Sequence, residues 1–164
     1  MKKFLIILVI LLSVSAVEAR RIKHPLIEIG PKASLYISSV RFGIGAEVVC
    51  NPLKVVGFRT ELIEVSFGDY TNFYMNAGGS LDALIYIPMR GIEPYIHTGF
   101  GFNVLSNGGS VTTFAIRAGM GLNYAVNRGT VLFVEPGIII VDSGVGGTDA
   151  IFRLSFGGRF GLLK

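Results

Sequence analysis

The 164-residue sequence has little charge, a single cysteine and no tryptophan. One cysteine, Cys50, excludes a disulfide framework and any zinc module built from cysteines. Charged residues make up only 16%, against ~25% in soluble domains. With 51% hydrophobic residues, 12 phenylalanines and 6 tyrosines, the chain is not a disordered one. The 15 basic and 11 acidic residues are scattered and form no basic stripe, so we expect no nucleic-acid partner.

The first segment has the layout of a secretory signal peptide. Two lysines follow the first methionine, residues 4–17 are almost wholly apolar, and small residues precede a cut after Ala19. This apolar run is shorter than the ~20 residues that a spanning helix needs. We therefore predict a signal peptide over residues 1–19 and one exported domain over residues 20–164. That domain has no second long apolar run, which excludes a helical membrane protein.

The exported part alternates between apolar residues and small or polar ones, which is the pattern of β-strands. The clearest stretches are long for a globular strand of ~5–6 residues, but they suit a tilted membrane-crossing strand of ~9–11 residues plus its ends. Turn signals separate the stretches. Eight strands are predicted, and an even number lets the first and last close with both termini on one side. Their ranges are 26–37, 41–50, 55–67, 73–87, 92–104, 111–126, 130–141 and 151–163.

The two faces of these strands indicate which side meets lipid. One face carries Phe, Leu, Ile and Met at nearly every position, and the other is mostly Gly, Ala, Ser and Asn with few ionisable groups. The second face is too bare to be a coat against water, but it suits a crowded interior. A sheet in lipid must leave no unpaired edge. We therefore predict an all-β, eight-stranded antiparallel up-and-down transmembrane β-barrel. A soluble periplasmic barrel around an apolar ligand remains the alternative.

Two strands break the alternation. Apolar residues at Leu62 and Ile63 stand side by side, which predicts a bulge and leaves the face of Glu64 open. Pro136 lies near the middle of the strand predicted over 130–141, and a closed barrel has no free edge for a proline. A second bulge is therefore expected there.

Three stretches resemble the small outer-membrane β-barrel domain family, which includes eight-stranded barrels related to outer membrane proteins A and X. They are PYIHTGFGFNV (94–104), FAIRAGMGLNYAV (114–126) and IFRLSFGGRFGLL (151–163). The resemblance covers nearly the whole exported chain. It implies a place in the cell outer membrane, with outer-membrane lipids and the assembly machinery as partners, and we expect a monomer. Family members usually end on an aromatic residue, whereas the last aromatic here is Phe160 and the chain ends Leu-Leu-Lys.

Charged residues on the predicted inner face are nearly balanced, and His97 lies among them. An eight-stranded barrel is only just wide enough for its own side chains, and buried charges persist when they are paired. We therefore expect a plug of ion pairs rather than a gated solute path or a proton relay. The predicted network consists of Arg41, Glu47, Arg59, Glu61, Asp82, His97, Arg117, Glu135, Arg153 and Arg159. Arg41, His97 and Arg117 are each followed by two glycines on the same face.

No residue carries a catalytic or metal signature. His97 has no nucleophile at suitable spacing, so we interpret it as a hydrogen-bonded interior histidine rather than the base of a lipid-modifying enzyme. The acidic and glycine-rich segment 142–149 matches no calcium loop. His24 precedes the barrel, and the sequence indicates no partner for it. We expect no metal and no cofactor.

The expected function is that of a non-enzymatic structural or surface barrel, with narrow solute passage left open. A lipid-modifying membrane enzyme is the alternative from another class. The turns near 51–54, 88–91 and 127–129 are expected in the periplasm, since the termini lie on that side. The loops near 38–40, 68–72, 105–110 and 142–150 would face outward, and they are short for this class of barrel.

Overall fold

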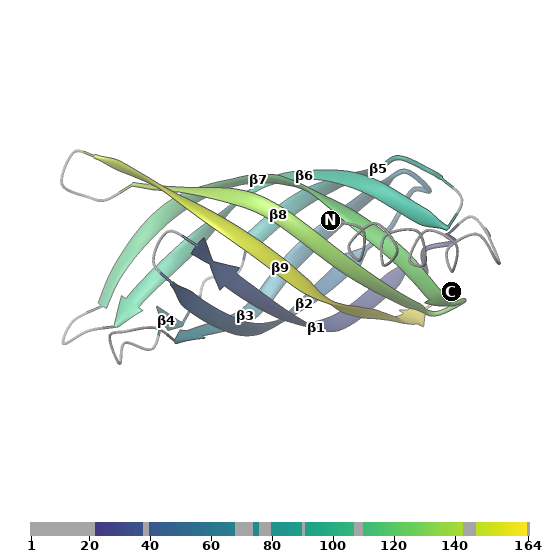
Figure 1. Cartoon of the computed structure of the whole chain (residues 1–164), viewed down its shortest axis with the longest axis horizontal. Helices are drawn as coiled ribbons and strands as arrows, with labels where there is room; N and C mark the ends of the chain where they lie inside the picture. The colour runs from purple at the N-terminus through teal and green to yellow at the C-terminus, as the bar shows by residue number, and fades with distance from the viewer. Residues whose placement is uncertain are drawn as a thin grey trace, which may run out of the picture.

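The computed structural model is a closed barrel of tilted antiparallel strands (Figure 1). It describes residues 22–37, 40–67, 74–75, 80–89, 91–106, 110–142 and 147–163. Among these residues, no helix is long and apolar enough to span a membrane. The strands are β1 (Ile27–Tyr36), β2 (Arg41–Cys50), β3 (Val56–Phe67), β4 (Tyr74–Met75), β5 (Ser80–Tyr86), β6 (Ile92–Ser106), β7 (Ser110–Asn127), β8 (Thr130–Asp142) and β9 (Thr148–Leu163).

These strands make the eight crossings that the alternation predicts. β4 and β5 are two parts of the fourth crossing, since both pair with β3 on one side and β6 on the other. β6, β7 and β9 are longer than predicted, mainly toward the end where β6–β7 and β8–β9 connect. The predicted signal peptide, the whole predicted loop 68–72 and parts of the other three predicted outer loops lie outside the described residues.

Pairing between β1 and β9 closes the sheet into a barrel. Ile27 at the start of β1 lies opposite Leu163 at the end of β9, so both ends of the barrel domain lie together. We call this the turn end, because the short connections β2–β3, β5–β6 and β7–β8 lie there. The opposite end, where β1–β2, β3–β4, β6–β7 and β8–β9 connect, is the loop end.

The apolar face points outward, as predicted. Phe100, Phe102 and Phe156 are 44%, 42% and 47% exposed on the outer surface. In contrast, Arg117 and Arg153 are only 5% and 4% exposed and lie inside the barrel. Glycines and ion pairs therefore fill the lumen, and the outside is a continuous apolar surface.

The bulge predicted in β3 is confirmed. Leu62 and Ile63 both face outward, and the register between β2 and β3 shifts at this point. The extra residue resets the alternation, so that Glu61 and Glu64 both face the lumen. The bulge thus brings two carboxylates inside within four residues.

The bulge predicted at Pro136 is wrong. The register between β7 and β8 is the same on both sides of Pro136, and its pairing with Leu154 of β9 is uninterrupted. Near Pro136, pairing is lost only opposite Met120 and Gly121 of β7. Because proline lacks the N–H of a ladder bond, the strand omits the bonds on that side without inserting a residue.

Candidate functional site: an ion-pair network in the lumen

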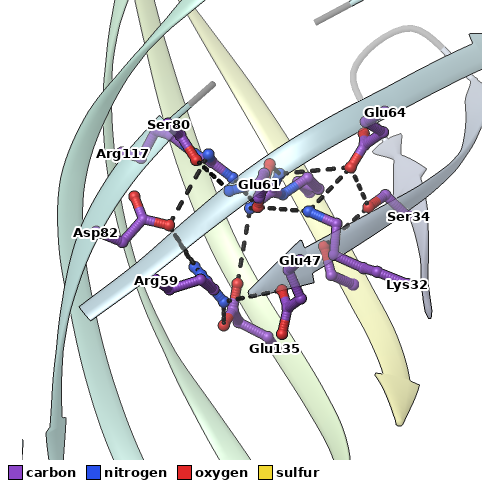
Figure 2. A network of polar contacts seen from close by, with 12 residues as sticks. Lys32, Ser34, Glu47, Arg59, Glu61, Glu64, Ser80, Asp82, Arg117 and Glu135 are labelled. Atoms are coloured by element: carbon purple, nitrogen blue, oxygen red, sulfur yellow. Dashed lines mark hydrogen bonds and ion pairs between the residues drawn. The ribbon is translucent and has the colours of Figure 1, made fainter. Parts of the chain in front are cut away.

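The structure brings nine of the ten predicted network residues together inside the barrel, where each is at most 5% exposed. Arg41 is the exception, since it is only half-buried at the start of β2 and lies over the ring of Tyr36, 5.2 Å from its centroid. The other nine come from β2, β3 and every crossing from β5 to β9. Figure 2 shows much of this network from close by.

Glu61 is the centre of the part of the network nearer the loop end. Its carboxylate contacts Lys32 of β1 and Arg117 of β7 (Figure 2). It also contacts Arg153 of β9. The Arg153 Nη2 atom lies 3.2 Å from Oε1. One anion therefore connects three strands that are not its neighbours in the sheet.

Glu64 continues this part of the network toward the loop end. Its Oε2 lies 2.9 Å from Lys32 Nζ and accepts a hydrogen bond from Ser34 at 3.1 Å. The hydroxyl of Tyr36 donates to its other oxygen. All of these partners lie on β1, so the β3 bulge gives β1 a carboxylate to bind.

Arg59 is the centre of the second part of the network. Its guanidinium donates to Asp82 Oδ2 at 2.9 and 2.7 Å, and to Glu135 Oε2 at 2.5 Å. Its Nη2 lies 3.3 Å from Nδ1 of His97. Glu47 lies within 3.7 Å of the same guanidinium. Four polar neighbours therefore hold the Arg59 guanidinium in place inside the lumen.

Arg159 extends the network toward the turn end. Its Nε donates to Glu47 Oε1 at 2.6 Å, and its guanidinium lies 4.3 Å from the ring centroid of Phe133 and 5.5 Å from that of Tyr95. Guanidinium groups bind aromatic faces well. The hydroxyl of Tyr95 donates to Glu135 at 2.8 Å, which links this cation back to Arg59.

Inward-facing glycines provide the room for these side chains. A Cβ atom on Gly121 would lie 2.2 Å from the ring of Tyr95, and one on Gly119 would lie 2.5 Å from Nε2 of His97. At Gly99 the same atom would lie 2.3 Å from the carboxylate of Asp82. Gly99, Gly119 and Gly121, three of the glycines that follow His97 and Arg117, thus leave space that neighbouring atoms occupy.

Apolar side chains flank the ion pairs at both ends of the lumen. Toward the loop end, Tyr36, Ala115 and Ile139 pack together, and Val141 and Ile151 pack against them. Toward the turn end the corresponding cluster is Val49, Leu84, Tyr86 and Tyr95. The ion-pair network is therefore enclosed between two apolar layers.

The segment 22–26, which precedes β1, covers the turn end of the lumen. His24 lies between two carboxylates, with Nδ1 3.1 Å from Glu28 Oε1 and Nε2 2.5 Å from Glu93 Oε1. Its ring stacks on Tyr86, with centroids 4.2 Å apart and planes 18° apart. Burial alone would lower the pKa of His24, but the hydrogen bonds and charges of Glu28 and Glu93 raise it to about 9.

Sequence reasoning missed five members of the lumen network: His24, Glu28, Lys32, Glu64 and Glu93. Lys32 has the parity of the inner face of β1 and Glu93 that of β6, so alternation could have found both. Among the described residues, seven carboxylates and five permanent cations are buried. A protonated His24 and the half-buried Arg41 bring the cations close to balance with the carboxylates.

The remaining predictions concern metal binding, Cys50 and the segment 142–149. Within the part of the chain that the structure describes, no group of His, Cys, Asp and Glu side chains is arranged to hold a metal ion. Cys50 is exposed on the outer surface. Residues 143–146, half of the segment 142–149, lie outside the described residues.

The fold and the filled lumen define a transmembrane-type β-barrel. No family model matches the sequence, and no curated protein matches it. The structure is similar to the N-terminal β-barrel domain of OprF from Pseudomonas aeruginosa, with a TM-score of 0.59, 16% identity, and coverage of 82% of this chain and 96% of that chain.

Neisserial surface protein A (NspA) is similar as well, with a TM-score of 0.58, 14% identity, and coverage of 83% of this chain and 96% of that one. A barrel from the de novo design of transmembrane β-barrels has a TM-score of 0.52 at 11% identity, over 84% of this chain and 97% of that one. Identities this low show the fold alone. The chain therefore has the fold of the eight-stranded outer-membrane β-barrels, as the resemblance of its sequence implies.

Proposed function

We propose that the protein is a non-enzymatic barrel of the cell outer membrane, exported by residues 1–19 and acting as a structural or surface protein. The observation that carries this proposal is the inverted distribution of side chains. Large apolar residues cover the outside, and twelve charged residues of the described strands are buried inside. Outer-membrane lipids would cover the apolar surface, and the assembly machinery would insert the chain.

The lumen argues against a soluble barrel that holds an apolar ligand. Such a barrel needs an apolar interior and a charged exterior. Here Arg59, Glu47 and Asp82 are 0% exposed, whereas Ile116 and Met120 are 51% and 64% exposed on the outer surface. Water contact with so much apolar surface would be unfavourable, and contact with lipid would not be.

The position of His97 argues against a lipid-modifying enzyme. The imidazole is 4% exposed inside the lumen, with Arg59 at 3.3 Å from Nδ1 and Glu135 at 3.4 Å from Nε2. A lipid substrate on the outer surface would not reach it. Incubation of the reconstituted protein with lipopolysaccharide or phospholipid, before and after His97→Ala, tests this point. A product that depends on His97 would contradict the proposal.

Membrane insertion is tested by fractionation and by a matched pair of substitutions on β7. The full chain should partition into the outer membrane and migrate differently on a gel with and without boiling, because closed barrels resist unfolding. Met120→Lys should impair insertion, since a lysine near the bilayer midplane costs about 2–4 kcal/mol, and Met120→Leu should not. A freely soluble protein that tolerates Met120→Lys would contradict the proposal.

A further inference from the structure

At the turn end of the barrel, the ring of His24 fills a pocket between two carboxylates and a tyrosine. Glu28 of β1 and Glu93 of β6, each 1% exposed, lie on either side of the His24 ring. Tyr86 of β5 forms the floor, stacked on the imidazole. Asn123 of β7 lies 3.5 Å from Glu93 Oε1, so four strands contribute to one small site.

The groups around the ring are selective for a planar cation. The two carboxylates lie at opposite edges of the imidazole, one at each nitrogen. The tyrosine face supplies a flat surface that binds a cation as well as a ring. Oε2 of Glu28 has no hydrogen-bond partner although it is buried, so this carboxylate has acceptor capacity left over.

The segment 22–26, which brings His24 into the pocket, is held mainly by its last two residues, Pro25 and Leu26. Leu26 N–H donates to the Leu163 carbonyl at 2.8 Å, and Asn51 N–H donates to the Leu26 carbonyl at 2.8 Å. Asn51 also joins the segment to the floor, because its Nδ2 donates to Pro25 O at 3.0 Å and its Oδ1 accepts from Tyr86 at 2.8 Å. Before Pro25, the described contacts of the segment are those of His24 and the buried Ile22.

We propose that the turn end is a binding site for a small planar cation, and that residues 22–26 are a displaceable strap which fills this site with the ring of His24. With His24 in place the mouth of the lumen is closed. When the strap is displaced, Glu28, Glu93 and Tyr86 become open to an imidazolium-like group from outside the chain. The proposal rests on the barrel fold and not on its place in a membrane, so it can be tested in detergent.

Chemical rescue is the direct test. His24→Ala should lower the temperature at which the barrel loses its unboiled gel mobility, because two carboxylates are left unpaired. At pH 6, added imidazole should restore most of the lost stability in a saturable way and should not affect the wild type. Pyrazole is the matched control, because its ring has the same size but stays neutral at this pH. It should not restore the stability of His24→Ala.

A second substitution connects the rescue to the pocket. Glu93→Gln combined with His24→Ala should abolish the effect of imidazole. The proposal is overturned if imidazole has no effect on His24→Ala, if pyrazole acts equally well, or if the rescue survives Glu93→Gln.

A measurement on the unmodified ring covers the case in which the His24→Ala barrel does not fold. The chain has only two histidines, so His97→Gln leaves a single ring to assign by ¹⁵N NMR. Both nitrogens of His24 should carry protons at pH 7, as required of a cation between two carboxylates. A neutral His24 ring at pH 7 would overturn the proposal.

Discussion

Single glycines make room for large side chains inside the barrel. Among the glycines that face an aromatic ring, Gly121 leaves the least space for a Cβ atom. It lies directly opposite Tyr95 in the β6–β7 pair, and the tyrosine ring occupies the space where a side chain would be. The hydroxyl of the same ring donates to Glu135. A displaced ring would thus disturb the packing and also a hydrogen bond of the network.

We predict that Gly121→Ala destabilises the barrel by about 1–3 kcal/mol, the usual cost of overpacking a well-packed site. Gly129→Ala is the matched control, because the nearest atom to its new Cβ is 3.9 Å away. The free energy of unfolding in urea, followed by gel mobility, measures both. Equal stability of the two variants would show that Tyr95 moves aside without cost.

Glu61 is the residue whose charge matters most, since it contacts three cations. Glu61→Gln keeps the shape and removes the charge, which leaves Lys32, Arg117 and Arg153 with less compensation. We predict a loss of about 3–5 kcal/mol, as for other broken buried pairs. Asp149→Asn, at an exposed acid near the loop end, should change the unfolding free energy little. A small effect of Glu61→Gln would mean that Glu64 takes over its role.

His24 should make stability depend on pH in the alkaline range. Its folded pKa of about 9 lies above the ordinary value of 6.5. Its contribution is therefore complete below pH ~6.5 and is lost as the pH rises through about 9. The difference in urea midpoint between the wild type and His24→Gln should be larger at pH 6 than at pH 10. A difference that grows with pH would contradict a protonated ring.

At the scale of the element, the β3 bulge decides how many carboxylates face the lumen. Glu61 and Glu64 are three positions apart, so strict alternation would send one of them to the outer surface. The extra outward residue at Leu62 and Ile63 removes this conflict. Deleting one residue at the bulge would leave both carboxylates inside, whereas deleting one elsewhere in β3 would not.

We predict that deletion of Leu62 is tolerated with little loss of stability, because it restores regular pairing with β2 without moving an ion. Deletion of Thr60, in the same strand, should cost about 3 kcal/mol or more. Without Thr60, Arg59 and Glu61 are adjacent in the strand and must face opposite sides. One of them therefore turns out of the lumen. Urea unfolding of both deletions compares them, and equal losses would show that the bulge has another role.

The alternation of faces was enough to predict the strands, because period two is a property of neighbouring residues. It placed Arg59, Glu135 and Arg159 inside, and all three are at most 1% exposed in the structure. It did not predict which ions pair, since that depends on contacts across the lumen between residues as far apart as Glu47 and Arg159. The same limit hid the partners of His24, whose two carboxylates are 4 and 69 residues away.

The prediction of a bulge at Pro136 was wrong for a related reason. A missing N–H can be met by a bulge or by an omitted ladder bond, and the residues near Pro136 do not distinguish the two. The structure omits the bonds opposite Met120 and Gly121. In β3, two adjacent apolar residues marked the bulge directly, so that prediction succeeded.

At the scale of the whole molecule, the network and its two apolar layers occupy the lumen over the part of the barrel that the structure describes. An aqueous path would need ions as well buried as Arg59 and Glu47 to separate. We predict that the purified barrel shows no steady conductance in planar bilayers. Glu61→Ala, which removes the centre of the part nearer the loop end, is the variant most expected to conduct. Steady channels in the wild type would contradict the plug and support solute passage.

The pairing of β1 with β9 has a consequence for how the barrel forms. Until β9 is in place the sheet has two open edges, and Glu61 and Glu47 lack their contacts with Arg153 and Arg159 of β9. A variant without β9 would keep an open seam and a surplus of negative charge inside. Closure of the barrel and neutralisation of its interior are therefore a single event.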